Sequence, residues 1–195
     1  PFIVTLSIWV ITVGFAAWYT EGITIPVPEA VYKIGRRDFF VIPIPVIMVA
    51  ITAAVFYFIL EKTIFGRSVF ATGANIKTAL SSGIKTAKTI FITYVISGLC
   101  AGFASITLVA RLGIASSGMG GDLLILDAIS AVIIGGASLS GGRGSIVGTL
   151  AGVLIITLIG NGLNLFGVSY FLTIIVKGFV IFIAVMIDAW RSKEK

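Results

Sequence analysis

Long apolar runs are the feature of this sequence that most restricts its fold. Phe2 to Tyr19 contains no charged residue, and similar runs extend over Phe39 to Leu60, Thr89 to Ala110, Ser145 to Phe166 and Ser169 to Trp190. A helix needs about 20 predominantly apolar residues to cross the hydrocarbon core of a bilayer. We therefore expect an all-α, polytopic bundle of transmembrane helices.

The stretch from Leu123 to Leu139 is apolar but shorter and rich in small residues, and the turn Ser140 to Gly144 follows it. Broken helices are tolerated at membrane depth where they line a cavity. The sequence is therefore compatible both with half-helices at 123–144 and with one continuous transmembrane helix. The chain is expected to have about six spans.

The composition agrees with a membrane protein. Hydrophobic residues make up 58% of the 195 residues and charged residues only 11%, whereas a soluble domain carries about 25% charged residues. The net charge of +6 is accordingly interpreted as a sign of topology and not of nucleic-acid binding. There is no histidine and a single cysteine, Cys100, so we expect no metal site and no internal disulfide.

The positions of the basic residues predict the orientation. The segment 61–88 has a net charge of +4, while the loops 20–38 and 111–122 are each balanced. Lys and Arg collect in cytoplasmic loops. We therefore place 61–88, Arg143 and the basic tail after Trp190 in the cytoplasm, which agrees with six crossings that start inside at Pro1. The basic residues used are Lys62, Arg67, Lys77, Lys85 and Lys88 of the segment and Arg191, Lys193 and Lys195 of the tail.

Glycines recur at helical spacing in two places. Gly144, Gly148 and Gly152 are four residues apart, and so are Gly98 and Gly102. Small residues at this spacing allow the backbones of membrane helices to approach closely. We predict that these glycines pack helices together.

Asp127 and Lys177 are charged residues that lie well inside apolar runs. Charges at membrane depth are costly and tend to pair or to line a water-filled path. Pairing across the bundle, or extension of the side chains toward an interface, is favoured here over a proton-coupling role. The sequence contains no paired carboxylates and no arrangement of a nucleophile and a base, so we do not expect an enzyme.

The glycine-rich turn 141–144 lacks the motif of an ATP-binding phosphate loop. A phosphate-binding loop needs a Lys followed by Ser or Thr after its last Gly, and this turn reads Gly-Gly-Arg-Gly and continues with Ser145. Any energy from ATP must therefore come from a partner.

The segment from Phe70 to Lys85 contains a short helix signal. Asn75 is suited to cap a helix over Ile76 to Leu80, and Gly83 is suited to end it. A capped helix that projects from the membrane has the shape of a docking element, and an ordinary amphipathic loop is equally compatible with the residues.

The sequence resembles the permease subunits of bacterial monosaccharide ABC importers, which are the relatives of the ribose, xylose and arabinose permeases. The resemblance covers most of the chain from Gly66 onward. The matching motifs are Gly66-Arg67, Ala71-Thr72-Gly73-Ala74-Asn75, Ser82-Gly83-Ile84, Leu126-Asp127-Ala128-Ile129, Gly135-Gly136-Ala137-Ser138-Leu139, Gly141-Gly142-Arg143-Gly144, Gly148-Thr149, Asn161-Gly162-Leu163-Asn164-Leu165, Gly167-Val168 and Val176-Lys177-Gly178.

This resemblance implies a single permease domain over 1–195 that matches the carboxyl-terminal part of a protein with about ten spans. Such permeases dimerise, with an identical or paralogous subunit, in the bacterial inner membrane. They bind a cytoplasmic ATPase through a coupling segment, here 61–88, and the ATPase holds the ATP and magnesium. An extracytoplasmic binding protein delivers the sugar.

The resemblance also assigns residues. It places Gly73, Asn75, Ala79, Ser82, Gly83 and Ile84 in the coupling segment, and it makes Asp127, Asn161, Asn164 and Lys177 candidates for lining or supporting the transport path. The chain departs from the family pattern at Ala74, at Thr78 and at Ile76-Lys77, which leaves the identity of the ATPase open. An ion-coupled secondary transporter and a purely scaffolding membrane module are the alternatives.

Overall fold

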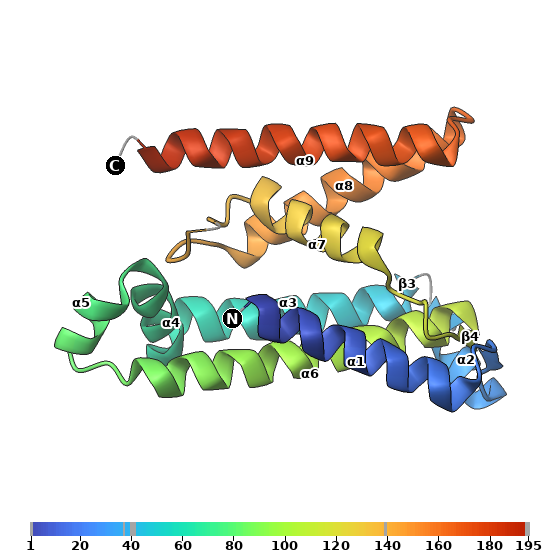
Figure 1. Cartoon of the computed structure of the whole chain (residues 1–195), viewed down its shortest axis with the longest axis horizontal. Helices are drawn as coiled ribbons and strands as arrows, with labels where there is room; N and C mark the ends of the chain where they lie inside the picture. The colour runs from blue at the N-terminus through green and yellow to red at the C-terminus, as the bar shows by residue number, and fades with distance from the viewer. Residues whose placement is uncertain (1, 37, 40–41, 139, 194–195) are drawn as a thin grey trace. The chain divides into compact units, whose positions relative to one another are not determined.

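The computed structural model describes residues 2–36, 38–39, 42–138 and 140–193. Leu139 of the family motif and Lys195 of the basic tail lie outside these residues. The described chain is almost entirely helical, as expected (Figure 1). The helices are α1 (Phe2–Thr20), α2 (Glu29–Arg36), α3 (Ile44–Lys62), α4 (Ile64–Ala74), α5 (Ile76–Ser81), α6 (Thr86–Leu112), α7 (Asp122–Ile134), α8 (Ile146–Leu165) and α9 (Tyr170–Lys193). The strands have two residues each and are β1 (Ile25–Pro26), β2 (Asp38–Phe39), β3 (Ile42–Pro43) and β4 (Ile114–Ala115).

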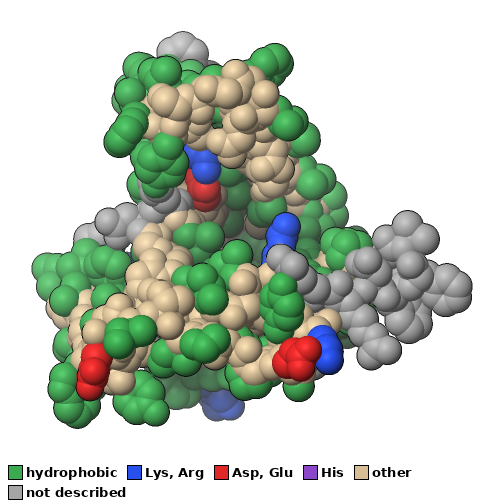
Figure 2. All heavy atoms as spheres, turned by 90° about the vertical axis from the view of Figure 1, so that its right-hand side faces the viewer, with side chains coloured by type: hydrophobic (Ala, Val, Ile, Leu, Met, Phe, Trp, Pro, Cys, Tyr) green, Lys and Arg blue, Asp and Glu red, His purple; other side chains and the backbone are tan. Residues whose placement is uncertain are grey.

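Four of the helices in the described chain are long and apolar enough to cross a membrane, namely α1, α3, α6 and α8. The apolar part of α9, Tyr170–Met186, is shorter. Large hydrophobic side chains on these helices are exposed, and hydrophobic atoms cover much of the face seen in Figure 2, with few charged side chains among them. Lipid is the solvent that suits such a surface.

The region 123–144 has neither of the two forms expected from the sequence. It contains one helix, α7, of 13 residues, and the residues that the structure describes between α7 and the N-cap of α8 at Ser145 are not helical. Gly136 ends α7 with a φ of +86°, which glycine adopts without steric cost. The amide of Ala137 donates to the carbonyl of Val132, and the amide of Gly136 donates to that of Ile133, which closes the last turn.

The chain divides into two compact units. In the first unit, Pro1–Thr52 with Val95–Gly121, β1 pairs with β4 in antiparallel register, with Ile25 opposite Ala115. The two charge-balanced loops therefore hydrogen-bond to each other. Gly35 of α2 lies against the backbone of Ala110 at the end of α6.

The second unit comprises Ala53–Tyr94 and Asp122–Lys195. Its core lies where α7 packs on α8, and α9 contacts both helices. On α7, Ser130 is fully buried, and Ala131 and Ile133 are also buried. On α8, Ile156 is buried.

Helix α4 was not expected from the sequence, which suggested only the short helix α5 within 61–88. Thr63 caps α4, because its hydroxyl accepts the amide of Gly66 at 3.2 Å. Gly66 is buried against the carbonyl of Leu60 in the last turns of α3, where a side chain would have no room. The chain can therefore turn sharply from α3 into α4.

Candidate functional site

Helix α5 begins and ends as the sequence predicts. The side-chain oxygen of Asn75 accepts the amides of Lys77 and Thr78 at 3.0 and 3.1 Å, which satisfies two of the amides left free at a helix start. Asn75 also closes α4, because its own amide donates to the carbonyl of Ala71. One residue thus fixes the corner between α4 and α5, the two short helices of segment 61–88.

The far end of α5 is fixed by Gly83, whose φ is +80°. The amide of Ile84 donates to the carbonyl of Ala79, and the amide of Gly83 donates to that of Leu80, each at 3.0 Å. This pair of hydrogen bonds is a Schellman motif, which commonly brings the residue after the glycine against the last turn of the helix. Ala79 is buried, Ile84 is partly buried and Ser82 is exposed, so α5 has one anchored face.

The other face of α5 is open. Ile76 and Leu80, one helical turn apart, are 51% and 55% exposed, and Lys77 and Thr78 are exposed beside them. Helix α5 therefore carries an apolar pair with an adjacent positive charge.

Gly73 does not lie on this open face of the coupling segment. A side-chain carbon placed at Gly73 would lie 2.7 Å from the backbone nitrogen of Gly142. The turn after α7 and the end of α4 are thus in backbone contact, and Arg143 lies in the same turn. Loop 140–144 and segment 61–88 therefore lie together, and their placement in the cytoplasm stays a prediction from the charge distribution.

Gly148 and Gly152 lie in the contact between α8 and α7. A side chain at Gly148 would collide with the carbonyl of Gly135, and one at Gly152 would collide with the carbonyl of Ala131. Gly144 has a looser contact, because a Cβ placed at this residue would lie 3.3 Å from the Cβ of Ala137. Gly135, which directly follows α7, was not predicted to pack against α8. Ala131 and Gly135 are also small residues four positions apart, which is the same spacing as that of Gly148 and Gly152.

Gly98 and Gly102 of α6 have open space around them. No atom of another described element lies within 4 Å of a Cβ placed at either residue. The packing role predicted for this pair stays a prediction.

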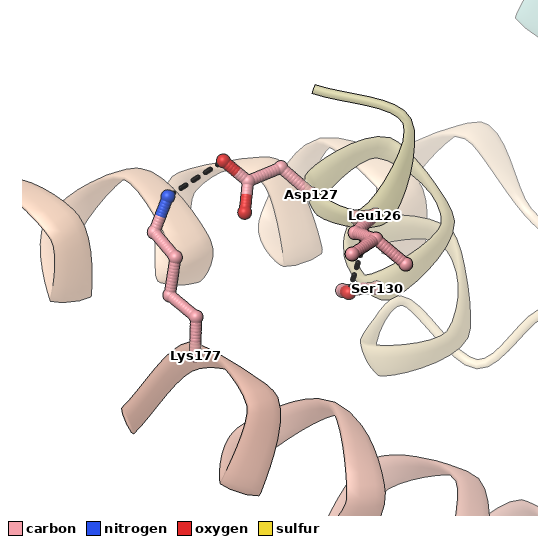
Figure 3. Close-up of polar contacts among 4 residues, drawn as sticks. All are labelled: Leu126, Asp127, Ser130 and Lys177. Atoms are coloured by element: carbon pink, nitrogen blue, oxygen red, sulfur yellow. Dashed lines mark hydrogen bonds and ion pairs between the residues drawn. The ribbon is translucent and has the colours of Figure 1, made fainter. Parts of the chain in front are cut away.

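Asp127 and Lys177 form an ion pair (Figure 3). The Nζ of Lys177, on α9, donates to Oδ2 of Asp127, on α7, at 2.6 Å. The side chain of Lys177 is 22% exposed and that of Asp127 is 30% exposed, so much of the ion pair is covered by protein. Ser130, one turn further along α7, donates its hydroxyl to the carbonyl of Leu126. The two charges identified within apolar runs neutralise each other.

Gly160 of α8 lies beside this ion pair. A Cβ at Gly160 would lie 3.5 Å from Cε and 3.7 Å from Nζ of Lys177. The lysine side chain therefore runs past α8 on its way from α9 to α7, and the sequence alone did not identify Gly160.

Asn161 and Asn164 lie on α8 near its end, and both are exposed. The carbonyl of Asn164 accepts the amide of Gly167, which has a φ of +69° and ends the helix. No hydrogen bond of either side-chain amide occurs within the described residues. Among those residues there is also no cluster of three or more metal-ligating side chains.

The sequence is similar to known permease proteins. Residues 1–185 match the family described as the branched-chain amino acid transport system permease component. The chain is 45% identical over 195 residues, 98% of its length, to the ribose import permease protein of Bacillus subtilis (strain 168), of which it covers 60%. No solved structure matches it.

Two other relatives are also sugar permeases by name. The chain is 42% identical to the xylose transport system permease protein of Haemophilus influenzae over 85% of its own length and 43% of that protein. It is 33% identical to the L-arabinose transport system permease protein of Escherichia coli (strain K12) over 99% of its own length and 59% of that protein. The chain spans about three-fifths or less of these relatives. With the match to the family over nearly all of its residues, the chain belongs to the family of permease components of branched-chain amino acid transport systems.

Proposed function

We propose that this chain is part of the transmembrane permease of an ATP-binding-cassette importer that takes up a monosaccharide or a related small polar solute. The observation that carries the proposal is the 45% identity to a ribose import permease over 98% of the chain. The xylose and arabinose relatives support a sugar rather than an amino acid as the substrate class. The chain itself performs no covalent chemistry in this proposal.

The coupling segment docks on the cytoplasmic ATPase, which holds the ATP and magnesium. The fixed corner at Asn75 and the Schellman motif at Gly83 support this role, because they hold α5 in one conformation before binding. Preorganisation lowers the conformational entropy lost on docking. Ile76 and Leu80 enter an apolar groove of the ATPase, and Lys77 faces an acidic rim.

The permease works as a pair of identical or paralogous subunits in the bacterial inner membrane. Segment 61–88 and the carboxyl-terminal tail face the cytoplasm, and an extracytoplasmic binding protein delivers the sugar to the other side. Asp127, Lys177, Asn161 and Asn164 line or support the path. ATP binding changes the relative stability of the inward-open and outward-open forms, because the closed ATPase binds one of them better.

Cross-linking in the full-length protein with its ATPase tests this proposal. Cys100 is replaced by Ala, and Asn75→Cys or Thr78→Cys is paired with cysteines on the ATPase surface. Cross-links that change with ATP are expected. If no cross-link forms and the complex does not co-purify, the hypothesis of an ATP-binding-cassette importer is wrong.

The alternatives give different outcomes. An ion-coupled secondary transporter would take up its substrate without ATP and would be stopped by ionophores. A scaffolding module would tolerate the charge reversals Lys77→Glu and Lys85→Glu, whereas a coupled permease loses uptake. The substrate class is tested by competition of labelled ribose uptake with xylose, arabinose and leucine, in which the proposal predicts competition by sugars only.

A further inference from the structure

The end of α4 and the turn between α7 and α8 meet through backbone atoms. A Cβ at Gly73 would lie 2.7 Å from the nitrogen of Gly142, one at Gly141 would lie 2.6 Å from the carbonyl oxygen of Gly73, and one at Gly142 would lie 2.7 Å from the Cα of Ala74. We call Gly73, Gly141 and Gly142 the glycine joint. Because no long side chain separates the two segments, a displacement of one cannot be absorbed by a change of rotamer.

The turn that carries Gly141 and Gly142 is itself fixed. The amide of Gly141 donates to the carbonyl of Ser138, and the amide of Ser138 donates to that of Arg143, each at 3.1 Å. Ser145 then caps α8, accepting the amide of Gly148 at 3.0 Å. The turn is thus braced by hydrogen bonds on both sides of the joint.

The two helices that the turn connects are also held together closely. Gly148 and Gly152 of α8 lie against the backbone carbonyls of Gly135 and Ala131 of α7. Close-packed interfaces of this kind transmit displacement and deform little. A push on Gly142 therefore moves α7 and α8 together.

Helix α7 carries Asp127, and Asp127 binds Lys177 of α9 at 2.6 Å. These contacts thus form a continuous series from α4 through the glycine joint and the α7–α8 pair to the ion pair on α9. All of these residues belong to the second compact unit.

We propose that Gly73, Gly141 and Gly142 are positioning residues that transmit the movement of the coupling segment to α7 and α8, and through Asp127 and Lys177 to α9. This inference rests on the proposed function, because the movement comes from the ATPase. The joint stays closed throughout the transport cycle, and its two sides move as one body.

Gly73→Ala is the substitution that isolates the joint. Gly141 and Gly142 have φ values of +89° and +75°, so any side chain there would also strain the backbone. Gly73 lies within the helix α4, where Ala is intrinsically the better residue. A loss of function in Gly73→Ala is then due to the contact with Gly142 and not to weakening of the helix.

The measurement compares Gly73→Ala with Gly14→Ala in the full-length protein, reconstituted with its ATPase and binding protein. Gly14 also lies within a helix, and no atom of another described element is within 4 Å of a Cβ there. Both variants should bind the ATPase and hydrolyse ATP. Gly73→Ala should transport between about threefold and thirtyfold less substrate per ATP hydrolysed, and Gly14→Ala should match the wild type. Equal transport per ATP in the two variants would overturn the inference.

A second measurement applies where Gly73→Ala does not assemble. In a Cys100→Ala background, Ala74→Cys and Gly142→Cys are oxidised to a disulfide after the complex has formed, and the reduced protein serves as the control. The cross-link should form equally with and without ATP, because the two sides stay in contact in every nucleotide state. Formation in only one nucleotide state would show that the two sides separate. Failure of the proposed function is distinct from both results, since the wild type itself would then show no ATP-dependent uptake.

Discussion

At the scale of single residues, the ion pair of Asp127 and Lys177 is the most informative contact. Neutralising one partner leaves the other charge partly buried beside apolar helices, which costs more than the loss of an exposed pair. We expect Asp127→Asn and Lys177→Met each to destabilise the full-length protein by about 1–3 kcal/mol, and the double variant to recover most of this loss. Thermal unfolding in detergent measures all three.

The same variants separate two roles for Asp127. If the carboxylate only neutralises Lys177, the double variant Asp127→Asn/Lys177→Met transports. A proton-coupling carboxylate would behave differently, because Asp127→Asn would abolish uptake in the single and the double variant alike.

Thr72 offers a second prediction at this scale. Its side chain is 6% exposed, and its hydroxyl has no hydrogen-bond partner within the described residues. An unsatisfied buried polar group costs about 1–3 kcal/mol, and Val has nearly the same shape without the hydroxyl. We expect Thr72→Val to raise the apparent melting temperature.

Thr89→Val is the matched control for this substitution. Thr89 is 8% exposed, but its hydroxyl donates to the carbonyl of Lys85 at 3.2 Å, so the variant gives up a hydrogen bond. It should gain nothing. A lowered melting temperature for Thr72→Val would mean that the hydroxyl has a partner in the assembled protein.

At the scale of helices, the contact between α7 and α8 depends on Gly152. A Cβ there would collide with the carbonyl of Ala131 and would lie 3.0 Å from the nitrogen of Gly135. Overpacking of this kind typically costs about 1–3 kcal/mol. We expect Gly152→Ala to lower the apparent melting temperature of the full-length protein in detergent.

Gly162→Ala is the control within the same helix. No atom of another described element lies within 4 Å of a Cβ at Gly162, so the same chemical change meets open space. The control should be as stable as the wild type or more so. If Gly152→Ala and Gly162→Ala behave alike, the close contact of α7 and α8 is not present in the folded protein.

The sequence was a good guide to these helices where local chemistry determines them. Asn75 and Gly83 mark the ends of α5 because capping depends on adjacent backbone groups. Helix α4 was missed because Gly66 and Gly73 look like helix breakers. These glycines allow close contacts with the backbones of Leu60 and Gly142, respectively, and a local sequence pattern does not reveal such contacts.

The same distinction applies to the candidate site. The charges of Asp127 and Lys177 stand out in apolar runs, so their pairing could be anticipated. The passage of Lys177 beside Gly160 could not be anticipated, because it depends on the route of the Lys177 side chain past α8. The spacing of Gly98 and Gly102 equals that of Gly148 and Gly152, yet only the second pair has a neighbour in the described chain.

At the scale of the whole molecule, α7 raises a question of length. Its 13 residues extend about 20 Å, and the hydrocarbon core is about 30 Å thick. The irregular backbone that follows is tolerated at membrane depth where protein covers it. Gly135, packed against Gly148, provides such cover. The prediction of six crossings therefore requires this region to cross the membrane with a helix shorter than the hydrocarbon core.

The topology gives the last prediction. Because β1 pairs with β4, we expect loops 20–38 and 111–122 on one side of the membrane. Because Gly73 lies against Gly142, we expect 61–88 and 140–144 together on the other side. In a Cys100→Ala background, single cysteines at Glu29 and Ser117 should react with a membrane-impermeant maleimide in intact spheroplasts. Cysteines at Lys77 and Ser140 should react only after permeabilisation. Reversal of all four would change the orientation predicted from the basic residues and leave the fold intact. A different side for the two members of either pair would contradict the contact that joins them.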